Sequence, residues 1–272
     1  MDVFASLQLC AGAEVLPNLA VAGDLLARAA DAGARVALLP ENFAFMGRGE
    51  ADKLAAAEDD GRGPMQDFLA AAAARHRLWI IGGSLPLKVP GAPTRTTNTL
   101  LVYDATGARV ARYDKIHLFD VDLPGQAERY RESAHVERGA AVVVVDTPLG
   151  RVGLSICYDV RFPELYRRLA AAGAEILVVP AAFTATTGRA HWEVLLRARA
   201  IENLAYVVAS AQAGTHANGR ETFGDSLIVD YWGRVLDRLP TGTGLVTATI
   251  DRAAQAEARA SFPALANRVL AT

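Results

Sequence analysis

Residues 150–166 read GRVGLSICYDVRFPELY, and the fold and the function both depend on how this stretch is interpreted. The apolar run over 151–156 predicts a strand that ends at Cys157. The chain then turns polar, meets Pro163 and continues into a Leu- and Ala-rich segment that predicts a helix over 162–173. A thiol between a strand and a helix is either a core residue or a nucleophile at the edge of a sheet.

The composition narrows the class of protein. The chain has 272 residues, of which 51% are hydrophobic and 21% charged, which is typical of a globular protein with a large core. The net charge is −2 and no polybasic run occurs, so we expect neither nucleic acid nor a membrane as a partner. The apolar stretches are too short to span a bilayer, and the N-terminus lacks a cationic signal region. Cys10 and Cys157 make neither a disulfide framework nor a zinc site, so we expect a soluble, reduced, cytoplasmic protein.

Strand-like and helix-like segments alternate along the chain. The pattern predicts strands over 4–9, 34–40, 78–83, 98–104, 108–114, 141–147, 151–156, 175–181, 205–212, 225–236 and 244–251. It predicts helices over 17–34, 63–77, 162–173, 191–203 and 252–260, and loops over 85–97, 120–140 and 213–224. So many strands rarely stay in one open sheet, so we expect a single α/β domain over 1–272 with two packed sheets covered by helices.

Three reactive side chains follow predicted strands, at the sheet edge where ligands gather in α/β folds. They are Glu41, Lys115 and Cys157. Each has a structural alternative: a cap or surface carboxylate, a solvated lysine, or a core cysteine. Together they suit acyl transfer from a C–N bond, since Glu41 would take the thiol proton and Lys115 would stabilise the oxyanion. A helix N-terminus after Cys157 would lower the pKa of its thiol. Cys10 also ends a strand but has no charged partner nearby in sequence, so we interpret it as a core residue.

The local motifs resemble those of the nitrilase superfamily of carbon–nitrogen hydrolases. They are LLPENF (38–43), RYDKIHLFD (112–120) and GLSICYDVRFPELYR (153–167), which match the glutamate, lysine and cysteine of the family in order. RYRESAHVERG (129–139) offers Glu132 as the second glutamate of the family, which would support Lys115 or orient the substrate. The resemblance implies a four-layer αββα sandwich, a homodimer or larger homo-oligomer, and neither metal nor organic cofactor.

Within the family, 117–125, 181–203, 206–216 and 228–235 look most like the members that hydrolyse deaminated glutathione. The alternative is an omega-amidase acting on α-ketoglutaramate or α-ketosuccinamate, or another small-amide hydrolase. These substrates are small amides that bear a carboxylate. A catalytically silent scaffold and a redox-sensing thiol are further alternatives, although the complete Glu–Lys–Cys set argues against the first and the lack of a nearby second cysteine against the second.

Four residues are candidates for binding the substrate. Arg161 would meet a carboxylate, and its alternative is a structural ion pair with Glu164. Phe183 and Thr184 follow a strand and should border the pocket, although Thr184 also lies where a helix N-cap is expected, and Tyr158 is next to Cys157.

Two further expectations concern the arginines of the predicted helix 191–203 and two departures from the family pattern. We expect Arg197 and Arg199 to pair with Glu193 and Glu202 rather than to form one anion site, because residues i and i+2 do not share a helix face. Two positions depart from the family pattern, Asp225 and Asn267, each of which stands where relatives carry a histidine.

Overall fold

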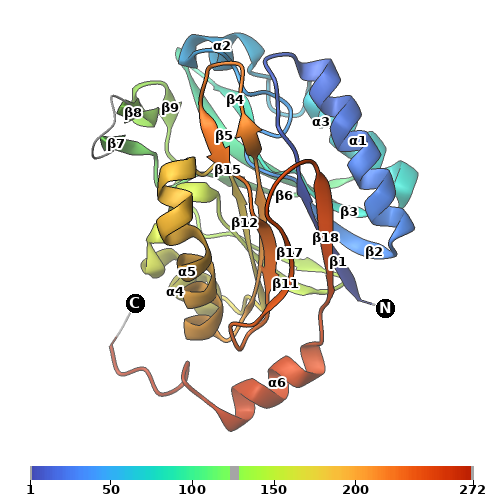
Figure 1. Cartoon of the computed structure of the whole chain (residues 1–272), viewed down its shortest axis with the longest axis vertical. Coiled ribbons are helices and arrows are strands. Elements are labelled where there is room, and N and C mark those ends of the chain that lie inside the picture. Colours follow the sequence, from blue (N-terminus) through green and yellow to red (C-terminus); the bar gives the residue numbers. More distant parts are fainter. Residues whose placement is uncertain (1, 123–128, 271–272) are drawn as a thin grey trace.

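Two β-sheets lie face to face between two pairs of helices, as Figure 1 shows. The computed structural model describes residues 2–122 and 129–270. The first sheet has the order β18 (Gly244–Thr249), β1 (Val3–Gln8), β2 (Ala34–Leu38), β3 (Trp79–Ile81), β5 (Ala92–Tyr103), β4 (Leu85–Val89), with β6 (Arg109–Asp114) and β9 (Val136–Glu137) also paired to β5. The second has the order β10 (Val144–Thr147), β11 (Gly150–Leu154), β12 (Ile176–Ala181), β13 (Tyr206–Ala211), β16 (Ser226–Val229), β17 (Val235–Leu239).

The outer layers are helical. Helices α1 (Val15–Asp31) and α3 (Pro64–His76) pack on the first sheet, and α4 (Pro163–Ala171) and α5 (Ala185–Asn203) pack on the second (Figure 1). Helix α2 (Glu50–Ala56) lies near the β4–β5 hairpin, and α6 (Arg252–Ser261) extends beyond the end of the sandwich. This is the αββα arrangement that the sequence predicts. Among the described residues, none of the helices is both long and apolar enough to cross a membrane.

Side-chain alternation along the strands builds the layers. In β2, Val36 and Leu38 belong to the core shared by the two sheets, while Ala37 belongs to the core under α1 and α3. Both faces of the sheet are therefore buried, which explains why the predicted strands read as almost continuous apolar runs. The sheets are also joined by hydrogen bonds, because Ser6 Oγ donates to Ala209 O at 2.8 Å and Ser210 Oγ donates to Leu7 O.

The strand directions gather the reactive strand ends at one edge. Strands β1, β2 and β3 are parallel, and β6 points the same way because two antiparallel pairings, β3 with β5 and β5 with β6, separate them. Strands β11, β12 and β13 are parallel in the second sheet. The carboxyl ends of β2 and β6 therefore lie at one edge of the first sheet, and those of β11 and β12 at one edge of the second.

Most predicted elements are confirmed within a few residues, but several loops were predicted wrongly. The predicted loop 85–97 is the β4–β5 hairpin, in which Pro86 is tolerated because β4 is the last strand on its side of the sheet. The predicted loop 213–224 holds a second hairpin, β14 (Ala213–Thr215) and β15 (Glu221–Phe223). The predicted strand 225–236 is two strands, β16 and β17, because Asp230 forms a turn by accepting from the backbone of Trp232 and Arg234.

Three further differences concern the loop 120–140, α5 and α2. The predicted loop 120–140 contains β7 (Asp120–Asp122), β8 (Arg129–Arg131), a 3-10 turn (Glu132–Ala134) and β9, while 123–128 lie outside the described residues. Helix α5 begins at Ala185, six residues before the predicted start, because Thr184 caps it. Helix α2 was not predicted.

Candidate active site

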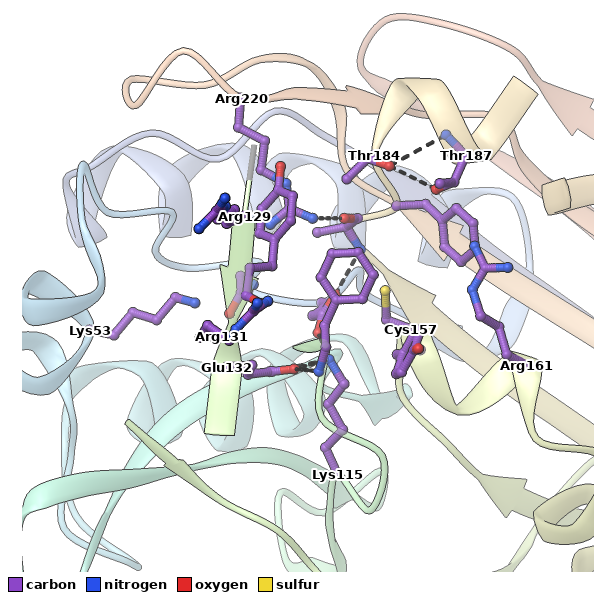
Figure 2. A pocket seen from close by; sticks show the side chains of 17 residues that line it. Lys53, Lys115, Arg129, Arg131, Glu132, Cys157, Arg161, Thr184, Thr187 and Arg220 are labelled. Carbon is purple, nitrogen blue, oxygen red and sulfur yellow. Dashed lines mark hydrogen bonds and ion pairs between the residues drawn. The ribbon is translucent and has the colours of Figure 1, made fainter. Parts of the chain in front are cut away.

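The three predicted reactive side chains meet at the facing strand ends. Glu41 follows β2, Lys115 follows β6 and Cys157 follows β11, and all three line one pocket (Figure 2). Lys115 Nζ donates to Glu41 Oε1 at 2.9 Å, and the negative charge of Glu41 acts on the Cys157 thiol in the same pocket. The first sheet thus supplies the carboxylate and the ammonium, and the second supplies the thiol.

Lys115 lies between two carboxylates. Its Nζ also donates to Glu132 Oε2 at 2.9 Å, and its side chain is only 2% exposed. Burial alone would lower the pKa of Lys115, but Glu132 and Glu41 together raise it well above its ordinary value. Asn98 Nδ2 holds the two carboxylates in place by donating to Glu41 Oε1 at 3.0 Å and Glu132 Oε1 at 3.1 Å. Lys115 is therefore a fixed, permanent cation beside the thiol.

Glu41 is ionised although it is buried. Burial would raise its pKa, but the charge and hydrogen bond of Lys115, with a smaller effect of the Cys157 thiol, outweigh burial and lower the pKa of Glu41 to about 2. The second carboxylate oxygen accepts from the backbone N–H of Ala182 at 2.8 Å, at the end of β12. The carboxylate is thus oriented by groups from both sheets.

Cys157 occupies a tight turn. Its φ is +48°, in the left-handed region that few non-glycine residues adopt, and it opens the 3-10 turn Cys157–Arg161. Burial and the negative charge of Glu41 raise the pKa of the Cys157 thiol, and Lys115 opposes them only in part. The expectation that the pKa of this thiol is lowered is wrong, because burial and the charge of Glu41 outweigh the groups that would lower it. The resting site holds a protonated thiol next to an ionised carboxylate.

Asp159 fixes this turn, and sequence reasoning did not single it out. It is fully buried, and its Oδ2 accepts from the backbone N–H of Ile156 at 2.9 Å and from Tyr113 Oη at 2.7 Å. Its Oδ1 pairs with His117, which donates through its backbone N–H at 3.0 Å. Tyr113 and His117 flank Lys115, so Asp159 ties the turn of Cys157 to the chain that carries the lysine. In the sequence, Asp159 is visible only as a residue close to Cys157, and nothing there indicates that it binds Tyr113 and His117.

The pocket above these residues is aromatic and cationic. Its aromatic residues are Phe119, Tyr130, Tyr158 and Phe183, and its other cations are Lys53, Arg129, Arg131, Arg161 and Arg220. All four predicted substrate-binding residues line it, namely Tyr158, Arg161, Phe183 and Thr184. Arg220 was missed, because it lies in a segment that was predicted to be a loop.

Arg161 does not form the ion pair that was its structural alternative. Within residues 2–122 and 129–270, Arg161 forms no ion pair with Glu164. The guanidinium lies over the ring of Phe183 at 5.0 Å and that of Tyr158 at 5.9 Å, and its Nη1 lies 3.2 Å from His191 Nδ1. Burial lowers the pKa of Arg161, so the pocket holds a partly desolvated cation without a carboxylate partner in the described chain.

Thr184 has the structural role that was its alternative. Its Oγ1 accepts from the backbone N–H of Thr187 at 3.4 Å and lies 2.7 Å from Thr187 Oγ1. It therefore caps α5 and borders the pocket at the same time.

The predicted helix ion pairs are also present. Arg197 lies 3.4 Å from Glu193, and Arg199 lies 2.8 Å from Glu202. These two arginines are thus held by carboxylates of their own helix, as the sequence predicts.

The other cysteine is not a core residue, contrary to the prediction. Cys10 is exposed, because it follows the end of β1 where the chain meets the β14–β15 hairpin. Its Sγ lies 3.7 Å from His216 Nδ1. Within the described chain, no group of three or more Asp, Glu, His and Cys side chains is arranged to hold a metal ion.

The two departures from the family pattern lie outside this pocket. Asp225 is buried and pairs with Arg238, with Nη2 to Oδ2 at 2.8 Å. Asn267 is exposed in the segment after α6.

Comparison with known proteins agrees with this architecture. A relative from Yersinia enterocolitica called deaminated glutathione amidase is 41% identical over 96% of this chain and 91% of its own length. A relative of the same description from Synechocystis is 43% identical over 97% of both chains. The crystal structure of the Caenorhabditis elegans NitFhit protein superposes with a TM-score of 0.92 at 38% identity, covering 98% of this chain and 65% of that longer fusion protein.

One solved structure bears on the cysteine. It is a glutamate-to-glutamine variant of an amidase from Nesterenkonia sp. AN1, in which acrylamide has added to the active-site cysteine. It superposes with a TM-score of 0.80 at 27% identity, over 97% of this chain and 98% of its own. A family model described as carbon-nitrogen hydrolase matches residues 4–260. The chain belongs to the carbon–nitrogen hydrolase family, and it is an enzyme that acts on C–N bonds.

Proposed function

We propose that this enzyme hydrolyses a linear amide through a thioester on Cys157. The observation that carries the proposal is the position of the Glu41 carboxylate, which lines the same pocket as the Cys157 thiol and accepts a hydrogen bond from Lys115. Cys157 Sγ attacks the amide carbon while its proton passes to Glu41, and the oxyanion is stabilised by Lys115. The C–N bond then breaks, and the leaving amine takes the proton from Glu41.

The second half of the reaction reuses the same carboxylate. Water attacks the thioester carbon and gives a proton to Glu41, the C–S bond breaks, and the proton returns to sulfur as the acid leaves. Glu132 supports this cycle by keeping Lys115 charged and directed at the reacting carbon, since it shares Nζ with Glu41. Neither metal nor organic cofactor is required in this scheme, because Lys115 meets the charge of the oxyanion.

Deaminated glutathione is the substrate we propose, with α-ketoglutarate and cysteinylglycine as products. Support comes from relatives of that description and from Arg161, a pocket cation that lacks a carboxylate partner in the described chain. An omega-amidase acting on α-ketoglutaramate or α-ketosuccinamate is the second candidate, since Arg161 would bind the keto-acid carboxylate of either substrate. An inactive scaffold is disfavoured, because it has no chemical need for a buried Glu–Lys–Cys contact.

Steady-state kinetics on deaminated glutathione and α-ketoglutaramate test the proposal. We expect a much higher kcat/KM on deaminated glutathione, and we expect Cys157→Ala to abolish turnover while its circular dichroism spectrum stays like that of the wild type. The matched control is Cys10→Ala, which removes an exposed thiol that does not line the pocket and should retain activity. Turnover by Cys157→Ala would refute the thioester, and a preference for α-ketoglutaramate would favour the omega-amidase.

We further propose that the enzyme works as a homodimer in the cytoplasm, as the family resemblance implies. Exposed apolar side chains on α5, Val194 at 68% and Ile201 at 49%, are compatible with such a contact. Light scattering coupled to size-exclusion chromatography should give twice the mass of one chain. A monomer at micromolar concentration would contradict the proposal.

A further inference from the structure

The cations of the pocket lie on two sides of Cys157. Figure 2 shows Arg161 on one side of the thiol, with Arg220, Arg129 and Arg131 on the other. Arg161 rests on the rings of Phe183 and Tyr158. A substrate with one anionic group at each end would therefore meet a cation at both ends.

Glu41 decides which end of the substrate faces which side. Glu41 gives its proton to the leaving amine, so the leaving half of the amide must lie on the Glu41 side of the scissile carbon. Arg220 lies on that side, because its charge acts on Glu41 and its Nη2 donates to Ala182 O, while Ala182 N donates to the Glu41 carboxylate. Arg161 instead lies on the Cys157 side, where the acyl half is bound, since its guanidinium packs on the ring of Tyr158, the residue after Cys157. The acyl half thus faces Arg161 and the leaving half faces Arg220.

Arg220 differs from the other cations on its side. Arg129 and Arg131 are 81% and 52% exposed, and both lie within ion-pair distance of Asp122. Arg220 forms no ion pair with any carboxylate of residues 2–122 and 129–270, and its buried Nε lacks a hydrogen-bond partner there. A buried donor without an acceptor is unfavourable, so this guanidinium is poised for an anionic ligand.

The position of Arg220 is well defined. It directly precedes β15, in a turn closed by the hydrogen bond from His216 N to Arg220 O at 2.9 Å. The hairpin is fastened to the pocket wall, since Phe223 N donates to Phe183 O at 2.9 Å. The guanidinium carbon lies 5.1 Å from the centre of the Tyr130 ring. A planar cation held between a ring and a backbone carbonyl is suited to bind a carboxylate by a two-pronged contact.

We propose that Arg220 binds a carboxylate at the far end of the leaving amine and thereby selects peptide-like amines over ammonia as the leaving group. The inference rests on the proposed amidase function and deepens it. Deaminated glutathione has a carboxylate on both halves, whereas α-ketoglutaramate has one only on its acyl half. Arg161 would then serve both substrates, and Arg220 would discriminate between them.

The test is a double-mutant cycle on binding, carried out in Cys157→Ala protein so that turnover does not interfere. Deaminated glutathione is compared with its C-terminal glycinamide, which lacks only the carboxylate of the leaving half, in proteins with Arg220 and with Arg220→Gln. With Arg220, we expect amidation to weaken binding by roughly 10- to 100-fold, as expected for one lost charge-assisted hydrogen bond. With Arg220→Gln, the two ligands should bind equally. An equal penalty for amidation in both proteins, or failure of deaminated glutathione itself to bind to the protein with Arg220, would overturn the assignment.

Kinetics in otherwise wild-type protein separate this inference from the proposed function. Arg220→Gln should lower kcat/KM on deaminated glutathione at least tenfold more than on α-ketoglutaramate, mainly through KM, while Arg161→Gln should lower both alike. The charge control is Arg151→Gln, on the exposed pair with Asp146, which should change neither. If the wild type cleaves deaminated glutathione and Arg220→Gln costs the same on both substrates, only the Arg220 assignment fails. If the wild type prefers α-ketoglutaramate, both the proposed substrate and the assignment fail.

Discussion

Glu41 and Cys157 share one proton, and the site keeps it on sulfur. The pKa of Glu41 is lowered to about 2 and that of Cys157 is raised, so the resting enzyme holds a thiol rather than a thiolate. Oxidation and alkylation follow the thiolate fraction, so this arrangement keeps Cys157 in its less reactive form in the resting enzyme.

This balance predicts an unusual effect of Glu41→Gln. The substitution removes the negative charge that raises the pKa of Cys157, while Lys115 remains charged beside Glu132. The pKa of Cys157 should therefore fall, and its alkylation by iodoacetamide at pH 7 should be about tenfold faster or more, although amide hydrolysis is lost. In the wild type, the alkylation rate should keep rising with pH beyond pH 9, and in the variant the rise should occur at lower pH.

The matched background for that measurement is Cys157→Ala, which reports alkylation of the exposed Cys10 alone. Mass spectrometry of the labelled peptide assigns the site. Slower alkylation of Cys157 in Glu41→Gln would mean that the carboxylate activates the thiol even in the resting enzyme.

At the scale of elements, the turn after β11 sets the direction of the Cys157 side chain. Cys157 has a positive φ of +48°, and the buried Asp159 closes the turn by accepting from Ile156 N at 2.9 Å. The same carboxylate binds Tyr113 and His117 on the chain around Lys115. The Asp159 carboxylate therefore links the Cys157 turn of the second sheet to the end of β6 in the first sheet by hydrogen bonds.

Asp159→Asn should lower both stability and activity. An amide cannot accept all of these hydrogen bonds, so we expect the free energy of unfolding to fall by about 2–4 kcal/mol. Urea denaturation measures the loss, and kcat should fall with it because the turn of Cys157 is no longer fixed. The control is Asp146→Asn, whose carboxylate is 83% exposed and pairs with Arg151 on the surface. Equal stability of the two variants would show that Asp159 does not fasten the turn.

For the whole molecule, the site exists only while the two sheets are packed together. Glu41 and Lys115 come from the first sheet, and Cys157 and Ala182 from the second. The core between the sheets includes side chains of both, among them the fully buried Phe4 of β1. Separation of the sheets would separate the carboxylate from the thiol.

Phe4→Ala should therefore weaken the fold and the site together. Truncation of a buried Phe typically costs about 3–5 kcal/mol. Activity and tryptophan fluorescence should be lost at the same urea concentration, lower than in the wild type, since unfolding of the sandwich dismantles the site. Leu16→Ala, at a position of α1 that is 73% exposed, is the control. Loss of activity well before the change in fluorescence would mean that the site opens without separation of the sheets.

Local patterns predicted much of this protein. The apolar runs predicted β1, β2, β11, β12 and β13. Glu41, Lys115 and Cys157 were singled out because they follow β2, β6 and β11. Such features depend on neighbours in sequence, because strand periodicity and strand termination are local. The segments with Pro, Gly and Thr were misjudged, since their pairing in the β4–β5 and β14–β15 hairpins depends on partners that propensity does not reveal.

The sequence by itself predicted which groups would do the chemistry, because Glu41, Lys115 and Cys157 are marked by their own motifs. Only the tertiary structure decided their protonation states, the partners of Asp159, the exposure of Cys10 and the place of Arg220 in the pocket. The physical reason is that pKa values, burial and hydrogen bonds depend on groups brought within a few ångströms of each other by the packing of two sheets, from positions as far apart as Glu41 and Ala182.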